Sequence, residues 1–307
     1  MTIDSRLTGP PARAVALEST LLAHGVPSST AIQLHHSLCQ PRPHEGAAPA
    51  LLAMLDGTPT VGITQSELER LIKRGSSLPK VNTANLGVMH HWGADAATTV
   101  STTMEIASAV GIRLFATGGL GGVHRGYGCH LDVSADLTAF TRFPVAVVTA
   151  GVKSILDIAA TREALETLGI TVVGYQTDHF PAFYRRRDDG HDLSVDARFD
   201  SINELCLFLD AEMRRTGRGV VVANPISESD ELDGDELQTW IDQAEDEAES
   251  AGVIGRALTP FILGRIHEFS KGKTIEANVA LVKNNASVAG ALAASMPIGP
   301  EFGTLMK

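Results

Sequence analysis

The stretch VAVVTAGVKS, residues 145–154, joins an apolar run to a glycine and a lysine. Val145–Thr149 is short and rich in β-branched residues, which predicts a strand covered on both faces, as in a parallel sheet. Lys153 follows at the end of that strand. Burial disfavours an ammonium ion and frees the amine as a nucleophile. The stretch therefore predicts both an inner strand and a candidate catalytic lysine.

Five other segments are also short, apolar and bounded by polar residues or glycine, and we predict strands there as well. They are Ala14–Leu17, Thr60–Ile63, Arg113–Ala116, Ile170–Gly174 and Gly219–Ala223. Four helices are predicted between the strands, at Gln65–Lys73, Thr102–Val110, Ser154–Leu168 and Ser201–Arg215. Strands that alternate with helices indicate an α/β fold with a layered sheet.

The last part of the chain, from about residue 234, has only helical periodicity. Helices are predicted at Gly234–Ser250, Thr259–Ser270 and Ile275–Ser295. We find no linker and no internal repeat, so we expect these helices to pack on the sheet. Residues 1–307 are therefore predicted to form a single α/β domain with a helical C-terminal part.

The composition excludes several classes of protein. The 307 residues carry a net charge of −11 with a pI of about 5.4, which argues against a nucleic-acid binder. No apolar run reaches the length of a membrane span, and Met1–Arg13 has no apolar core typical of a secretory signal. The three cysteines, Cys39, Cys129 and Cys206, are far apart and fit a reducing compartment. We expect a cytoplasmic protein.

A glycine-rich segment, ATGGLGGVHRG at residues 116–126, follows one predicted strand. Glycines let the backbone approach an anion closely, and successive N–H groups can face a phosphate. The spacing matches neither the dinucleotide-binding nor the P-loop pattern, so a flexible turn is an equally good interpretation. His124 and Arg125 within the segment favour an anionic ligand.

A second segment, LDVSADL at residues 131–137, places Asp132 and Asp136 on either side of Ser134. Carboxylate oxygens suit Mg²⁺ or Mn²⁺, and they also bind hydroxyl groups. The alternative is that these residues cap a helix that opens at Leu137.

Glu18, Thr117 and Lys153 each follow a predicted strand. Ligands of open α/β sheets bind beyond the carboxyl ends of the strands, so this shared placement predicts one site. A buried carboxyl such as Glu18 can have a raised pKa and serve as an acid, although a loop glutamate is the commoner case. Lys80 near an amine nucleophile could lower its pKa or hold a phosphate; alone, it would be a surface lysine.

Together these segments resemble the pseudouridine-5'-phosphate glycosidase family, which includes the enzymes of indigoidine-cluster type. The resemblance runs over about residues 14–295. Its motifs, in order, are ALEST (16–20), GTPTVGIT (57–64), KV (80–81), ATTVSTTM (97–104), FATGGLGGVHRG (115–126), DVSADL (132–137), VVTAGVKSILDI (147–158), TDHFPAFY (177–184), VVANPI (221–226), TPFIL (259–263) and EANVALVKNNASVAG (276–290).

The resemblance implies a three-layer α/β/α fold with a mixed central sheet, and a homotrimer. It implies that Lys153 forms a Schiff base with C1' of ribose 5-phosphate, that Glu18 donates a proton and that Asp132 binds Mn²⁺ or another divalent cation. We expect Asp136 to move protons near the sugar hydroxyls. The expected substrate-binding residues are Lys80, Val100, Thr117, His124, Ser134, Ala135, Asp136 and Asn278.

The chemistry implied is the making or breaking of a carbon–carbon bond between ribose 5-phosphate and an aromatic aglycone. Three segments depart from the family pattern: residues 26–48, residues 82–85, which lack the family's two arginines and aspartate, and residues 185–191. Because of these departures, we favour a C-glycosynthase that attaches ribose 5-phosphate to an aromatic natural product, as in alnumycin biosynthesis. The alternative is a pseudouridine-5'-phosphate glycosidase, which yields uracil and ribose 5-phosphate.

Two hypotheses from other classes are weaker. A sugar-phosphate-binding protein without activity would not need Lys153 and Glu18 together, and an N-glycoside hydrolase would need carboxylates but no buried lysine.

Overall fold

The computed structural model describes residues 1–39, 47–128, 131–253 and 258–297. Cys129 and residues 40–46 of the altered segment 26–48 lie outside the described residues. Within the described residues the main sheet has eleven strands: β1 (Asp4–Ser5), β2 (Ala14–Glu18), β3 (Ala48–Leu55), β4 (Thr58–Val61), β5 (Lys80–Val81), β6 (Ala96–Thr98), β7 (Leu114–Ala116), β9 (Ala146–Thr149), β11 (Val172–Tyr175), β12 (Ala197–Phe199) and β13 (Val220–Ala223).

The sheet is mixed, as predicted. Its order is β1-β4-β3-β2-β7-β9-β13-β11-β12, with β6 pairing with β3 and with β5. The path from β3 to β12 is parallel throughout, whereas β3 is antiparallel to β4 and to β6. The inner strand predicted from residues 145–149 is β9, fully buried between β7 and β13.

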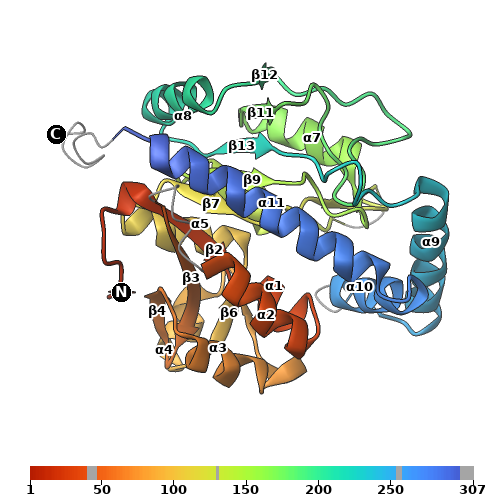
Figure 1. The fold of residues 1–307 in the computed structure, drawn as a ribbon. Coiled ribbons are helices and arrows are strands. Elements are labelled where there is room, and N and C mark those ends of the chain that lie inside the picture. Colours follow the sequence, from red (N-terminus) through yellow and green to blue (C-terminus); the bar gives the residue numbers. More distant parts are fainter. Residues whose placement is uncertain (40–46, 129–130, 254–257, 298–307) are drawn as a thin grey trace.

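Helices cover both faces of the sheet and make the three layers. The long helix α11 (Lys273–Ser295) crosses one face and contacts β2, β7 and β9, as Figure 1 shows in blue. Helices α2 (Ser28–Cys39) and α8 (Ile202–Thr216) pack beside it. Helix α5 (Val100–Ala109) contacts β2, β7 and the short α6 (Ala135–Phe140). The remaining α-helices are α1 (Thr20–His24), α3 (Gln65–Ile72), α4 (Leu86–His91), α7 (Ile158–Thr167), α9 (Gly234–Ser250) and α10 (Leu258–Phe269).

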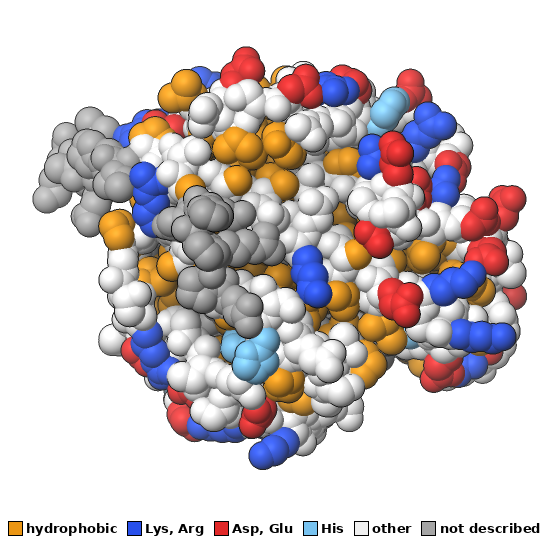
Figure 2. All heavy atoms as spheres, in the orientation of Figure 1, with side chains coloured by type: hydrophobic (Ala, Val, Ile, Leu, Met, Phe, Trp, Pro, Cys, Tyr) orange, Lys and Arg blue, Asp and Glu red, His pale blue; other side chains and the backbone are white. Residues whose placement is uncertain are grey.

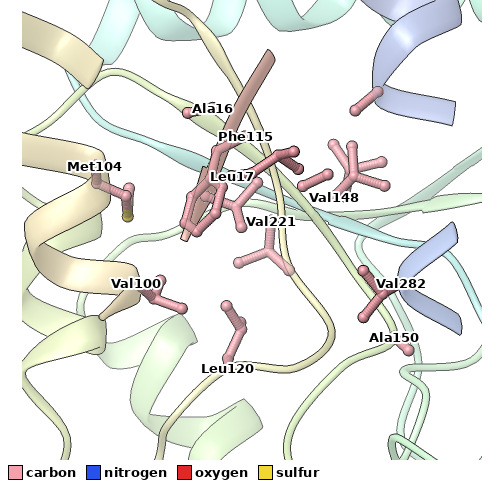
Figure 3. Packing of buried hydrophobic residues seen from close by; sticks show 14 of the residues in the cluster. Ala16, Leu17, Val100, Met104, Phe115, Leu120, Val148, Ala150, Val221 and Val282 are labelled. Carbon is pink, nitrogen blue, oxygen red and sulfur yellow. The ribbon is translucent and has the colours of Figure 1, made fainter. Parts of the chain in front are cut away.

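The apolar core lies between these layers. Figure 3 shows Val100 and Met104 of α5 on one side of Phe115 in β7, and Val282 of α11 on the other. The same buried cluster extends to α9 and α10. Helix α11 packs on the sheet as expected, whereas α9 packs mainly on α10, and α10 packs on α9 and α11. Charged side chains gather over the region of α9 and α10 on the right of Figure 2. Among the described residues, no helix is long and apolar enough to cross a bilayer.

Two expectations about the elements need correction. The strand β3 was not predicted, because Ala48–Leu55 holds alanine, leucine and methionine, which favour helices, and no β-branched residue. The helix predicted from Ser154 begins instead at Ile158. Leu156 and Asp157 first pair with β8 (Val123–His124), and the Asp157 carboxylate then caps the helix by accepting a hydrogen bond from the Ala160 N–H at 2.8 Å.

A buried amide network connects α11 to the sheet. The Asn285 side chain is fully buried; its Nδ2 donates to the Thr117 carbonyl at 2.7 Å, and its Oδ1 accepts from Asn224 Nδ2 at 2.9 Å. Thr117 follows β7 and Asn224 follows β13, so one side chain links the ends of two strands to the covering helix.

Replacing Asn285 with alanine should lower the free energy of unfolding by about 2–4 kcal/mol, because buried polar groups of Thr117 and Asn224 lose their partner. Urea denaturation measures the change as a shift in midpoint. The neighbouring Asn284, half-buried with one longer bond of 3.3 Å to the Pro225 carbonyl, is the matched control. Its alanine variant should lose about 1 kcal/mol or less. Equal losses in the two variants would contradict this role of Asn285.

Candidate active site

The carboxyl ends of β2 and β9 bring Glu18 and Lys153 to one place. Both line two adjoining cavities, and they share this lining with Thr20, Lys80 and Thr259. The polar cavity, of about 150 Å³, is lined in addition by Asn82, Thr99, Val100, Ser101, Gly121, His124, Ser134, Ala135, Asp136 and Leu156. The apolar cavity, of about 70 Å³, is lined in addition by Leu21, His24, Gly25, Gly118, Gly119, Phe183, Pro260, Leu263 and Asn278.

Glu18 is the last residue of β2, and its side chain is buried. The Thr117 hydroxyl donates a hydrogen bond to Glu18 Oε1 at 2.5 Å. Burial raises the pKa of Glu18, while the nearby Lys153 ammonium and the Thr117 bond oppose the rise. A carboxyl whose pKa is raised keeps its proton to higher pH and can act as an acid. Thr117 itself lies behind Glu18 and supports it, and it does not line either cavity.

Lys153 is held by a tight glycine turn after β9. Its backbone N–H donates to the Leu120 carbonyl at 3.2 Å. Gly151 has a φ of +86°, and a Cβ there would lie 1.8 Å from the Pro181 carbonyl oxygen, so only glycine fits. Lys153 is half-buried and lines both cavities together with Glu18.

Lys80 brings a second amine to the same cavities. It lies on β5, and its carbonyl accepts a hydrogen bond from Asn85 Nδ2 at 3.2 Å. Burial and the neighbouring Lys153 lower the pKa of Lys80 to about 8, with Glu18 opposing the shift. A lysine with this pKa is partly neutral near physiological pH.

Asp136 joins three segments of the polar cavity. Its carboxylate accepts hydrogen bonds from the backbone N–H groups of Ser101 at 3.0 Å and Gly121 at 2.9 Å. A Cβ at Gly121 would lie 2.4 Å from Ser134 Oγ, so this approach requires glycine. The Ser134 hydroxyl caps α6, which begins at Ala135 and not at Leu137. Because both Asp136 oxygens accept from the backbone, the residue is well placed to fix the shape of the cavity.

The other predicted residues fall on one cavity or the other. Val100, His124, Ser134 and Ala135 line the polar cavity, and the buried Asn278 lines the apolar one. Asp132 lines neither.

Asp132 is the residue predicted to bind metal. Its Oδ2 lies 3.9 Å from Nδ1 of His124, and its side chain is 38% exposed. The described residues contain no group of three or more His, Cys, Asp or Glu side chains arranged to hold an ion. Asp132 and His124 therefore offer one oxygen atom and one nitrogen atom as metal ligands.

Several cavity residues received no role from the sequence. Thr20, Ser101 and Phe183 are examples, and His24 is another. Phe183 adopts a left-handed backbone, with φ of +65°, and its ring lies so close to Gly119 that a Cβ there would be 2.5 Å away. This contact forms because the TDHFPAFY segment and the glycine-rich segment lie together in the folded chain. Neither segment, taken alone, predicts that contact.

The altered segment at residues 185–191 lies elsewhere. Arg185 and residues 187–191 line a larger cavity of about 550 Å³ together with the starts of α7 and α9. Leu156 borders both this cavity and the polar cavity. Asn82, in the altered segment 82–85, lines the polar cavity itself.

Comparison with known proteins identifies the family of the chain. Residues 10–295 match the family described as indigoidine synthase A like protein. The chain belongs to this family. The resemblance to the pseudouridine-5'-phosphate glycosidase family is confirmed by relatives bearing that name. One from Dinoroseobacter shibae is 43% identical over 283 residues, with 92% of each chain covered, and one from Geobacillus kaustophilus is 44% identical over 282 residues, covering 91% of this chain and 92% of the relative.

Two solved structures share the fold of this family member. An indigoidine synthase A-like protein from Thermotoga maritima has a TM-score of 0.86 at 34% identity, with 96% of each chain covered. The prealnumycin C-glycosynthase AlnA, solved in complex with ribulose 5-phosphate, has a TM-score of 0.84 at 32% identity, covering 96% of this chain and 98% of the other. The α/β fold is thus confirmed, and the chain is a relative of enzymes.

The coupling between the two amines is testable. In a Lys153→Met variant the pKa of Lys80 should rise above about 8, because a neighbouring positive charge that disfavours the ammonium is gone. The pH dependence of amine labelling at Lys80, followed by mass spectrometry, measures the midpoint. Labelling of the exposed Lys73 is the internal reference and should be identical in both proteins. A Lys80 midpoint that stays constant or falls would contradict the coupling.

Proposed function

We propose that this protein cleaves the carbon–carbon glycosidic bond of pseudouridine 5'-phosphate, giving uracil and ribose 5-phosphate. The observation that carries the proposal is the position of Lys153 and Glu18, which lie where a polar and an apolar cavity meet. The polar cavity suits a sugar phosphate, and the apolar cavity suits an aromatic ring. The names of relatives at 43–44% identity support this choice.

The polar cavity suits the sugar phosphate. Ser101, Ser134 and Asn82 offer groups that hydrogen-bond hydroxyls or phosphate oxygens, and Lys80 adds positive charge. The apolar cavity has Leu21, Phe183 and Leu263 among its walls, which suit a flat ring. With the two halves placed in this way, C1' of the sugar lies between the cavities, where Lys153 is.

In the first step, Lys153 as a free amine attacks C1'. The bond between C1' and the ring oxygen breaks, and Glu18 gives its proton to that oxygen, so the sugar opens while still attached to the base. The raised pKa of Glu18 suits this role, because the carboxyl must hold a proton when the substrate arrives.

In the second step, the bond between C1' and the base breaks. The Lys153 nitrogen, positively charged after its attack on C1', first gives up a proton and regains a lone pair. The electron pair of the breaking bond leaves with the ring, whose carbon takes up that proton, and the nitrogen lone pair forms the C1'=N⁺ bond. Water then adds to C1' and releases ribose 5-phosphate and the free amine. The overall change is the addition of one water across the glycosidic bond. The lysine is needed because a carbon leaving group cannot be expelled by protonation of a heteroatom.

Replacing Lys153 with alanine should abolish the cleavage of pseudouridine 5'-phosphate. It should also abolish the covalent adduct that borohydride traps when the protein is incubated with ribose 5-phosphate. Intact-protein mass spectrometry measures the adduct, and peptide mapping locates it. The matched control is Lys73→Ala, an exposed lysine outside both cavities. Trapping that persists at the wild-type level in Lys153→Ala would refute the assignment.

A C-glycosynthase is the second candidate function, and one observation favours it: the structural similarity to AlnA at 32% identity. We expected this reading from the altered segments. Two considerations now weigh against it: the higher identity to proteins named glycosidases, and the place of residues 185–191 away from the apolar cavity. Incubation with ribose 5-phosphate and either uracil or an electron-rich naphthoquinone separates the two candidates, since only a C-glycosynthase of this kind uses the second acceptor.

We also propose that Asp132, with His124 beside it, holds a Mn²⁺ ion whose other ligands are water or substrate oxygens. Carboxylate and imidazole donors suit this ion. When bound, it would add positive charge beside the phosphate subsite.

Replacing Asp132 with asparagine should weaken Mn²⁺ binding by about tenfold or more, because the anionic ligand is lost. Electron paramagnetic resonance titration of free Mn²⁺ measures the affinity. Asp178→Asn, which breaks an exposed ion pair with Arg198, is the matched control. Equal Mn²⁺ affinity in the Asp132 variant and the control would show that the ion, if bound, lies elsewhere.

A further inference from the structure

The strand that carries Glu18 meets another strand end to end. β2 and β6 lie on the same side of β3, because Leu52 pairs with β2 and β4 while the next residue, Ala53, pairs with β4 and β6. β2 is parallel to β3 and β6 is antiparallel, so the two strands run toward each other. Their carboxyl ends therefore meet beside β3, at Glu18 in β2 and Thr98 in β6.

Two buried hydroxyl groups close this meeting point, which we call the Ser19–Thr98 junction. Ser19 directly follows Glu18, and both Ser19 and Thr98 are fully shielded from solvent. The Thr98 N–H donates a hydrogen bond to Ser19 Oγ at 3.0 Å, and the Ser19 N–H donates to Thr98 Oγ1 at 3.3 Å. Each side chain thus satisfies a buried backbone N–H at the end of the other strand.

The hydrogen bonds also fix the direction of the two hydroxyl protons. Thr98 Oγ1 donates to the Leu52 carbonyl at 2.9 Å, so its single proton points to β3. The two hydroxyl oxygens lie 3.3 Å apart, and Ser19 is therefore the donor between them. The Thr98 carbonyl accepts from the hydroxyl of Thr20, which lines both cavities, at 2.7 Å. A buried network satisfied in this way holds β2, β3 and β6 in one arrangement.

The junction lies on the route that connects Lys80 to Glu18 through the sheet. Among the described residues, β5 pairs only with β6, and β2 pairs only with β3 and β7. Lys80 is on β5, and the residue after it, Val81, lies opposite Thr98. The sheet pairings therefore lead from Lys80 to β6, and from there to β2 through β3 or directly through the junction.

We propose that Ser19 and Thr98 are positioning residues that hold the Lys80 amine in the cavities by locking the ends of β2 and β6 together. Held there, the amine lies with Glu18 and Lys153, where it binds the sugar phosphate. The two hydroxyls are buried and act only through Lys80. The inference rests on the function proposed above for its kinetic consequence, whereas the position of the amine does not depend on that function.

The ionisation of Lys80 reports on its position. The titratable groups that share the two cavities with it are Glu18, His24, His124, Asp136 and Lys153. Burial is the main cause that lowers the pKa of Lys80 to about 8; Lys153 lowers it further, and Glu18 raises it. If the ends of β2 and β6 separate, water reaches the amine and screens the charge of Lys153. The pKa of Lys80 then rises toward the ordinary value of a lysine.

The test compares Ser19→Ala and Thr98→Val, which each remove one hydroxyl, with Thr98→Ser, which retains it. In the first two variants the midpoint of amine labelling at Lys80, followed by mass spectrometry, should rise by about half a pH unit or more. KM for pseudouridine 5'-phosphate should rise by about three- to tenfold, with a smaller change in kcat, because the amine that binds the phosphate is displaced. Thr98→Ser should keep both values close to those of the wild type.

Ser270→Ala is the matched control, because it breaks another buried pair of hydroxyls, Ser270 Oγ and Thr274 Oγ1 at 2.9 Å, outside both cavities. It should lower the Tm as Ser19→Ala does, but leave the Lys80 midpoint and KM unchanged. A shift of equal size in Ser270→Ala would show a general loss of stability and contradict the positioning role. Thermal melting checks folding, and Ser19→Ala, which leaves the bond from Thr98 to Leu52, keeps the test open if Thr98→Val does not fold.

The labelling measurement needs no substrate, so it separates this inference from the proposed function. If wild-type protein forms no adduct with ribose 5-phosphate, the proposed function fails, and the labelling midpoints still decide whether the junction positions Lys80. If the Lys80 midpoint is the same in the wild type and in the folded Ser19→Ala and Thr98→Val variants, the positioning role alone is refuted.

Discussion

The structure depends on one buried carboxyl and two half-buried amines that lie together at one edge of the mixed sheet. Glu18, Lys80 and Lys153 line the same two cavities, and the charge of Lys153 shifts the pKa of both Glu18 and Lys80. Burial favours the neutral forms, and opposite charges favour the ionised ones. The outcome is a carboxyl, Glu18, whose pKa is raised and an amine, Lys80, whose pKa is lowered to about 8. The chemistry proposed above needs an acid and an amine in the same site.

Close backbone approach makes this arrangement possible. Gly151 allows the chain to turn against the Pro181 carbonyl before Lys153, and Gly121 allows the Asp136 carboxylate to bind backbone groups of two segments. Asn285 fixes the end of β7 to the covering helix α11. Strands that bring residues together from distant parts of the sequence thus need small residues and buried polar contacts at their ends to hold the geometry.

Much of this could be predicted from the sequence. Glu18 and Lys153 follow apolar strands, and parallel strands end at one edge, so their proximity follows from the pattern. The split into polar and apolar cavities could not be predicted, because Phe183 and Leu263 resemble ordinary core residues until the chain folds. His24 also received no role from the sequence, and only the structure places it on the apolar cavity. The strand β3 was missed for a local reason: its residues favour a helix, and burial between β2 and β4 overrides that preference.

The most direct measurement is a crystal structure of the protein after borohydride reduction in the presence of ribose 5-phosphate. The account predicts continuous electron density from Nζ of Lys153 to C1' of the opened sugar, with the phosphate in the polar cavity and the apolar cavity left free for the base. Density that joins the sugar to Lys80, or a phosphate that lies in the apolar cavity, would contradict it.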